Sequence, residues 1–211
     1  MTDRRSARRA ATKDEILAAA WSLARQEGLV GITMRDLGAR VGMTAQSLYS
    51  YFASKHHIYD AMFEQGYRAF AEWMSAASDD GDRGEPIPAA SAEQLVASAH
   101  ADARRYFTFC VDDPVRFQLL FQRTIPGFVP SEGSYAIAVQ VLEQMRLRTA
   151  LLGVDGDGPF DLWTAVMSGL ASQQLANDPG GTRWERLVDD AVDMLLAHTV
   201  TTRSPKLRST R

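Results

Sequence analysis

The chain has 211 residues, of which 45% are hydrophobic, and a net charge of −3, a composition sufficient for a hydrophobic core. The single cysteine, Cys110, excludes an intramolecular disulfide, and no apolar stretch is long enough to span a membrane. Because the N-terminus also lacks the apolar segment of a signal peptide, we expect a cytoplasmic protein of one or two domains.

Apolar residues recur at helical spacing along the whole chain, and no segment shows the sustained alternation typical of strands. An all-α fold is therefore expected. Capping-box patterns that begin at Thr12, Ser91 and Thr182 mark the starts of three helices, and residues 79–88 form a polar loop. The predicted helices cover residues 12–27, 34–41, 45–51, 54–78, 92–111, 113–123, 133–152, 159–177 and 183–200.

Charge is distributed unevenly along the chain. Residues 1–60 contain nine basic and six acidic residues, whereas residues 61–202 contain ten basic and twenty acidic residues. A basic N-terminal end suits phosphate binding, and an acidic body suits a surface that faces away from DNA. Alternatively, the acidic residues are simply the solvated faces of helices. The basic segment 203–211 is expected to be a disordered tail.

Four arginines precede the first predicted helix: Arg4, Arg5, Arg8 and Arg9. A basic arm of this kind can reach the minor groove or the phosphates of DNA. The alternative is a disordered tail that only improves solubility.

Residues 33–55 have the pattern of two short helices joined by a tight turn, with a third helix beginning at their end. Thr33 and Thr44 are suited to cap the two short helices, because a threonine hydroxyl can accept a backbone N–H at a helix start. Gly42 can adopt the left-handed backbone that ends the first of them. Each short helix has an apolar pair spaced four residues apart: Leu37 with Val41, and Leu48 with Phe52. The pattern is that of a helix-turn-helix, whose second helix enters the DNA major groove.

From Thr12 to about Met62 the chain resembles the TetR family of bacterial transcriptional repressors. Gly38 departs from the pattern, because relatives usually carry alanine there, and a helix-interior glycine costs about 0.5–1 kcal/mol. We expect this glycine to loosen the first helix of the motif. A second departure is His56-His57, in place of an acid and an apolar residue. The resemblance rests on Ile16–Ala20, Gly28, Ile32–Leu37, Val41–Thr44, Ser47–Phe52 and Ser54-Lys55.

Chemistry and the resemblance together predict the DNA-contacting residues. The amide of Gln46 can pair with adenine, and the methyl group of Ala45 can contact a thymine methyl. Hydroxyl groups, arginine and lysine can instead hold phosphates without reading sequence. Alternatively, Tyr49 is a packing residue, Arg35 forms a surface ion pair and Lys55 is merely solvated. The predicted set is Thr33, Arg35, Thr44, Ala45, Gln46, Ser47, Tyr49, Tyr51 and Lys55.

Aromatic residues at helical spacing follow the motif. In TetR-like proteins the helix after the motif links the DNA head to a ligand cavity, so the resemblance implies a small-molecule effector. Few polar groups accompany these aromatic residues, which suits a mostly apolar ligand. The alternative is that they simply fill a core. The predicted ligand-binding residues are Phe63, Tyr67, Phe70, Trp73, Tyr106, Phe109, Phe117 and Phe121.

Residues 113–121 also resemble a segment of the TetR subgroup that has a Trp/His-Gly type C-terminal domain, although Ser168-Gly169 stands where that subgroup has His-Gly. The last two predicted helices carry apolar stripes suited to a four-helix bundle between two copies, as a palindromic site requires. Packing of the same faces within one chain is the alternative. The predicted interface residues are Trp163, Met167, Leu170, Trp184, Leu187, Ala191 and Leu195.

No residue pattern indicates catalysis, a cofactor or a metal site. The sequence therefore predicts a non-enzymatic, homodimeric repressor that binds double-stranded operator DNA and is released by a small ligand, with no membrane partner. Its expected domains are a DNA-binding domain at 1–53, a regulatory domain at 54–202 and the tail. A helical small-molecule binding protein that has lost DNA binding and an enzyme built on a helical bundle are the alternatives.

Overall fold

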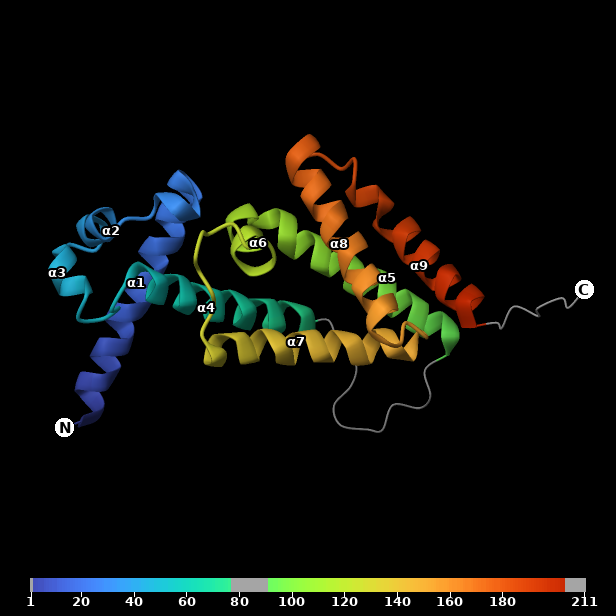
Figure 1. The fold of residues 1–211 in the computed structure, drawn as a ribbon, viewed down its shortest axis with the longest axis horizontal. Helices are drawn as coiled ribbons and strands as arrows, with labels where there is room; N and C mark the ends of the chain where they lie inside the picture. The colour runs from blue at the N-terminus through green and yellow to red at the C-terminus, as the bar shows by residue number, and fades with distance from the viewer. Residues whose placement is uncertain (1, 77–90, 204–211) are drawn as a thin grey trace, which may run out of the picture. The chain divides into compact units, whose positions relative to one another are not determined.

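The computed structural model describes residues 2–76 and 91–203, and within these ranges it contains helices and no strand (Figure 1). The predicted all-α fold is confirmed. The loop at 79–88 and residues 204–211 of the tail lie outside the described residues. The helices are α1 (Thr2–Gly31), α2 (Met34–Arg40), α3 (Ala45–Leu48), α4 (Lys55–Ser75), α5 (Ala92–Asp112), α6 (Pro114–Phe121), α7 (Glu132–Leu151), α8 (Asp157–Asn177), the short 3-10 helix η1 (Glu185–Leu187) and α9 (Val188–Arg203).

The start of α1 differs from the prediction, because the helix begins at Thr2 and not at residue 12. Thr12 therefore lies inside a helix, where its hydroxyl donates to the carbonyl of Arg8 at 3.1 Å in place of capping. The predicted capping box at Ser91 is confirmed, with both of its hydrogen bonds to Gln94 present. The one predicted at Thr182 is wrong, since η1 begins after Trp184 without a side-chain cap.

The chain forms two compact units. The head unit comprises Met1–Ala69 and Val115–Val139, and the body unit comprises Phe70–Pro114 and Gln140–Arg211. The predicted boundary between residues 53 and 54 separates DNA reading from regulation and stays a prediction. Packing divides the chain later, because the first turns of α4 belong to the core of the head unit.

The core of the head unit is built by the buried faces of α1 to α4. Ile16, Leu37 and Leu48 are fully buried, and so are Ile58 and Met62 of α4. These side chains come from four different helices, so the core holds the short α2 and α3 against the longer α1 and α4. Full burial of such side chains contributes about 1.5–3 kcal/mol each.

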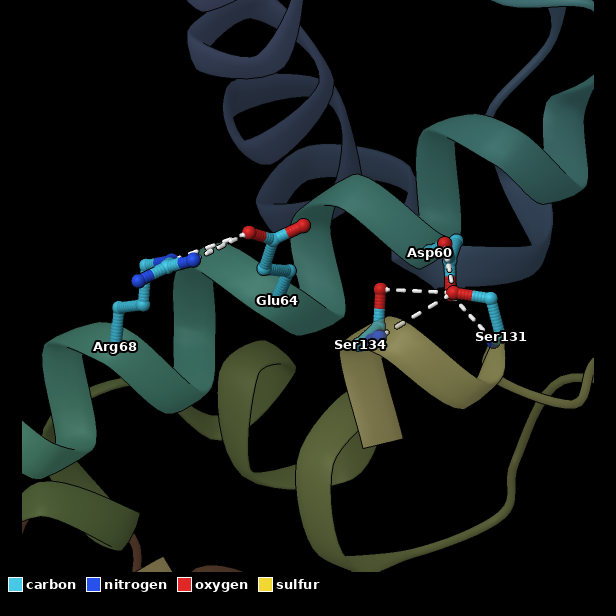
Figure 2. Close-up of polar contacts among 5 residues, drawn as sticks. All are labelled: Asp60, Glu64, Arg68, Ser131 and Ser134. Carbon is cyan, nitrogen blue, oxygen red and sulfur yellow. Dashed lines mark hydrogen bonds and ion pairs between the residues drawn. The ribbon is translucent and has the colours of Figure 1, made fainter. Parts of the chain in front are cut away.

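Polar contacts tie α4 to the start of α7 in the head unit (Figure 2). The Asp60 carboxylate accepts the backbone N–H of Ser131 at 2.7 Å and its hydroxyl at 2.8 Å. The Ser131 oxygen also accepts the N–H of Ser134 at 3.3 Å, which caps α7. Asp60 therefore holds the residue that begins α7, and two segments distant in sequence are fixed to each other.

In the body unit, α5 packs against both α8 and α9. Polar pairs add to the apolar contact between α5 and α9: the Arg104 guanidinium lies 2.6 Å from the Asp189 carboxylate, and the His100 ring lies 2.8 Å from the Asp193 carboxylate. The Tyr106 hydroxyl lies 2.7 Å from that of Ser168 in α8. None of the described helices is long and apolar enough to cross a membrane.

We expect Asp60→Ala to lower the free energy of unfolding by about 2 kcal/mol, because it removes two hydrogen bonds to a charged acceptor. Urea denaturation followed by circular dichroism measures the change. Glu64→Ala is the control, since it removes a carboxylate from the same helix that pairs only with exposed Arg68 at 2.8 Å. That change should stay below about 0.5 kcal/mol. Equal losses in the two variants would contradict a structural role for Asp60.

Candidate nucleic-acid interface

The two short helices of the motif are each fixed by a side-chain cap. The Thr33 hydroxyl accepts the N–H of Asp36 at 3.1 Å at the start of α2. The Thr44 hydroxyl accepts the N–H of Ser47 at 3.1 Å at the start of α3. A four-residue helix is too short to be stable alone. The cap and the burial of Leu48 therefore hold α3 in place.

Two glycines shape the turn between α2 and α3. Gly42 has a φ of 66°, which favours glycine. Met43 donates its N–H to the carbonyl of Gly38 at 2.8 Å, and a β-carbon at Gly38 would lie 2.7 Å from the Met43 carbonyl oxygen. The absence of a side chain at Gly38 thus permits the close approach of the turn to α2. We expected this glycine to loosen α2, but its close contacts with the turn indicate instead that it allows tight packing there.

Most of the predicted DNA-contacting side chains lie on the surface of the head unit. Tyr49 is 46% exposed, and Thr33, Arg35, Thr44, Gln46 and Ser47 are also exposed. Ala45, Tyr51 and Lys55 are half-buried. The amide of Gln46 and the guanidinium of Arg35 project from helices whose other faces are covered. The two threonine hydroxyls, in contrast, already cap their helices.

Lys55 has a structural partner that the sequence did not reveal. Its Nζ donates to the carbonyl of Val30 at 3.0 Å and lies 5.4 Å from the centre of the Tyr59 ring. Partial burial lowers the pKa of Lys55, and burial raises the pKa of Tyr59 to about 12. The Tyr59 hydroxyl donates to the carbonyl of Leu29 at 2.6 Å. Lys55 therefore joins the start of α4 to the end of α1, and its contact with DNA stays a prediction.

Arg9, which the sequence placed in a basic arm but not in the predicted contact set, is held beside α3. Its guanidinium lies 4.9 Å from the centre of the Tyr51 ring and donates to the carbonyl of Ser50. Lys13, one turn along α1, lies 5.4 Å from the centre of the Phe52 ring. The first turns of α1 are thus attached to the segment that follows α3. The sequence signal for this attachment was the spacing of Arg9 and Lys13, which lie four residues apart and therefore on one face of a helix.

The predicted ligand-binding residues fall into two aromatic groups. In the head unit Tyr67 lies 4.8 Å from Phe63 and 5.8 Å from Phe121, measured between ring centres. In the body unit Phe70 lies 4.8 Å from Phe109 and 5.9 Å from Tyr106. Phe117 lies in the head group, 5.8 Å from Phe121, and Trp73 in the body group, where its indole N–H donates to the Arg105 carbonyl at 2.9 Å. Both groups are packed aromatic clusters.

The predicted dimer-interface residues are mostly covered by their own chain. Four of them are buried within the body unit: Trp163, Met167, Ala191 and Leu195. Leu170 and Trp184 are half-buried, and Leu187 is exposed. Because a side chain buried in one chain has little surface left for a second copy, the four buried residues are core residues. Neighbouring Leu162 in α8 and Met194 in α9 are large apolar residues that are exposed, at 41% and 58%.

Comparison with known proteins agrees with this geometry. Residues 16–62 match the family model described as bacterial regulatory proteins, tetR family. These residues contain all of α2 and α3 together with the parts of α1 and α4 that build the shared core.

Two relatives from Mycobacterium tuberculosis are named as regulators. The chain is 23% identical to the HTH-type transcriptional regulator Rv1816 over 143 residues, which are 65% of this chain and 57% of the relative. It thus spans little more than half the length of that protein. It is 24% identical to the HTH-type transcriptional repressor Rv1353c over 196 residues, which are 88% of this chain and 69% of the relative.

The fold also matches a solved structure, described as AibR in complex with isovaleryl coenzyme A and operator DNA. The two chains are 18% identical, and the TM-score is 0.59. The match covers 87% of this chain and 97% of AibR. At this identity the similarity establishes the fold.

The methyl group added by Gly38→Ala must displace the backbone carbonyl of Met43, which costs about 1–3 kcal/mol. Because alanine in a helix returns about 1 kcal/mol, we expect a net destabilisation of up to about 2 kcal/mol. Gly133→Ala is the matched control, since a β-carbon there meets open space within α7. Thermal unfolding of both variants provides the measurement. A Gly38→Ala protein that melts at or above the wild-type temperature would show that the turn has room for a side chain.

Proposed function

We propose that the chain, whose residues 16–62 match the tetR family of bacterial regulatory proteins, is a homodimeric transcriptional repressor of that family, released from a palindromic operator by a small, mostly apolar ligand. The observation that carries the proposal is the exposed, capped α3 on a buried frame. Such a helix can enter the major groove without any rearrangement of the head unit.

In the proposed complex, α3 reads bases and the residues around it hold phosphates. Gln46 is exposed at the second position of α3, where its amide can pair with the N6 and N7 atoms of adenine. Ala45 offers a methyl group to thymine. Arg35, at the start of α2, is exposed and can bind a phosphate oxygen, which positions the head without reading sequence.

A second copy of the chain supplies the other half of a palindromic reader. We place the dimer contact on the exposed faces of α8 and α9, not on the buried residues of those helices. Leu162 and Met194 provide exposed apolar surface there, and a β-carbon at Gly169 would meet open space, so a partner helix can approach closely. Four helices, two from each copy, would form a bundle.

Ligand control is proposed to act through α4. This helix contributes Ile58 and Met62 to the core of the head unit, and its last turns, with Phe70 and Met74, are buried as well. A ligand that displaces the C-terminal turns of α4 would therefore move the frame that carries α3. The description of AibR, a protein of similar fold, names both an acyl coenzyme A and operator DNA, which supports an effector with an apolar part.

The DNA prediction uses gel mobility shifts with the DNA upstream of the protein's own gene. Gln46→Ala should reduce base preference at one position in each half-site, by about 1–3 kcal/mol of discrimination. Arg35→Ala should weaken all sequences alike and reduce the slope of log K against log salt by about 0.9. An inverted repeat should bind far better than one half-site.

Two results would contradict the DNA proposal. Equal affinity of the wild type for the upstream DNA and for a scrambled duplex would favour a helical ligand-binding protein without DNA binding. Unchanged base preference in Gln46→Ala would remove this residue as a reader.

The ligand prediction uses a series of acyl coenzyme A compounds of increasing chain length, with free coenzyme A as the control. A compound that releases the operator should bind the protein about 5- to 150-fold more weakly when the operator is present, because allosteric coupling is reciprocal. Calorimetric titration with and without operator measures the ratio. The same ligand affinity in both titrations would refute allosteric release by that compound.

A further inference from the structure

We infer that the first three turns of α1 form a second DNA-contacting element, which binds phosphates beside those held by the helix-turn-helix. The inference rests on the proposed function and adds a surface that the motif does not contain. Its basis is the basic stripe, which we define as Arg5, Arg9 and Lys13.

The basic stripe lies on one face of α1, since its members are spaced four residues apart. Two of its three members are fixed to the reading end of the head unit. Arg9 lies over the ring of Tyr51 and Lys13 over the ring of Phe52, both in the segment that follows α3. Arg5 therefore projects one turn beyond Arg9 on the side of α1 that faces the DNA-reading segment.

The first turns of α1 have no core of their own chain to cover. Residues 4–11 are all exposed, and the first buried side chain along α1 is that of Ile16. Within the head unit these turns project past α3 (Figure 1). Burial of apolar side chains thus does not explain why the helix extends this far.

The charge of the segment is unbalanced within the chain. Residues 4–13 contain five basic residues and no acidic residue. Like charges four apart on a helix repel by about 0.2–0.5 kcal/mol per pair, and Arg4 with Arg8 forms another such pair. A polyanion bound alongside would relieve this repulsion.

Operator DNA fits the segment better than a lipid surface does. A membrane-surface helix needs large apolar residues opposite its basic face. The residues between the arginines are instead small: Ser6, Ala7, Ala10 and Ala11. Attachment to the segment after α3 also brings the basic stripe to the molecule that α3 reads.

The arginines divide into two roles. Arg9 is a positioning residue, because its guanidinium is bound to the Ser50 carbonyl and the Tyr51 ring. The guanidinium groups of Arg5, in the basic stripe, and of Arg8, its neighbour three residues along α1, have no hydrogen-bond partner among the described residues and are the phosphate-binding groups of this inference. Each phosphate neutralised adds about −0.9 to the slope of log K against log salt, without any preference for base sequence.

The test compares the full-length double variant Arg5→Ala/Arg8→Ala with the wild type in operator binding over a range of salt concentrations. The slope should become less negative by about 1.8, while the ranking of mutated operators stays the same. Hydroxyl-radical footprinting should show lost protection at the outer phosphates of each half-site. Arg5→Lys/Arg8→Lys, which keeps the charge, should retain the wild-type slope.

Arg68→Ala/Arg123→Ala is the charge-matched control, since both arginines are exposed in the head unit outside the proposed DNA surface. It should leave the slope unchanged. An unchanged slope in Arg5→Ala/Arg8→Ala, with specific binding intact, would overturn the inference and leave the proposed function standing. Loss of phosphatidylglycerol vesicle binding in that variant, with the operator slope unchanged, would overturn it in favour of a membrane contact. Absence of specific operator binding by the wild type would instead refute the proposed function itself.

Discussion

Burial of the first half of α4 in the head core is the constraint on which the rest of the structure depends. Ile58 and Met62 fill the space between α1, α2 and α3, and the Tyr59 hydroxyl is bonded to the end of α1. The short helix α3 therefore shares its core with the first half of α4. Because α4 continues as one helix to Ser75, the residues that pack against the motif and the buried Phe70 and Met74 belong to the same helix.

The position of α3 in the motif depends on a helix cap and a tight turn more than on the area that the helix buries. α3 has only four residues, so its position is set by the Thr44 cap, the buried Leu48 and the tight turn that Gly38 allows. These interactions involve the inner face and the ends of α3. The side chain of Gln46 is exposed and forms no hydrogen bond among the described residues, so its amide stays available, as a base-reading residue requires.

Basic residues around the motif have different duties, although their sequence signal is the same. Arg9 and Lys55 are each bonded to a backbone carbonyl of the head unit, whereas the guanidinium groups of Arg5 and Arg35 are exposed and have no hydrogen-bond partner among the described residues. An exposed cation is hydrated and can exchange water and counterions for phosphate. A cation that already satisfies a carbonyl gains less from that exchange, so in the proposed complex the position in the fold would decide which arginine contributes affinity.

The sequence by itself determined the all-α fold, the caps at Thr33 and Thr44 and the left-handed turn at Gly42, because these depend on residues close in the chain. It did not determine the start of α1, the attachment of Arg9 or the close approach at Gly38. Apolar residues at helical spacing also show that one face of a helix is covered, but they do not show which part of the protein covers it. The tertiary structure alone therefore divided the aromatic residues between two units and assigned Trp163, Met167, Ala191 and Leu195 to the core of one chain, since the covering surfaces come from segments distant in sequence.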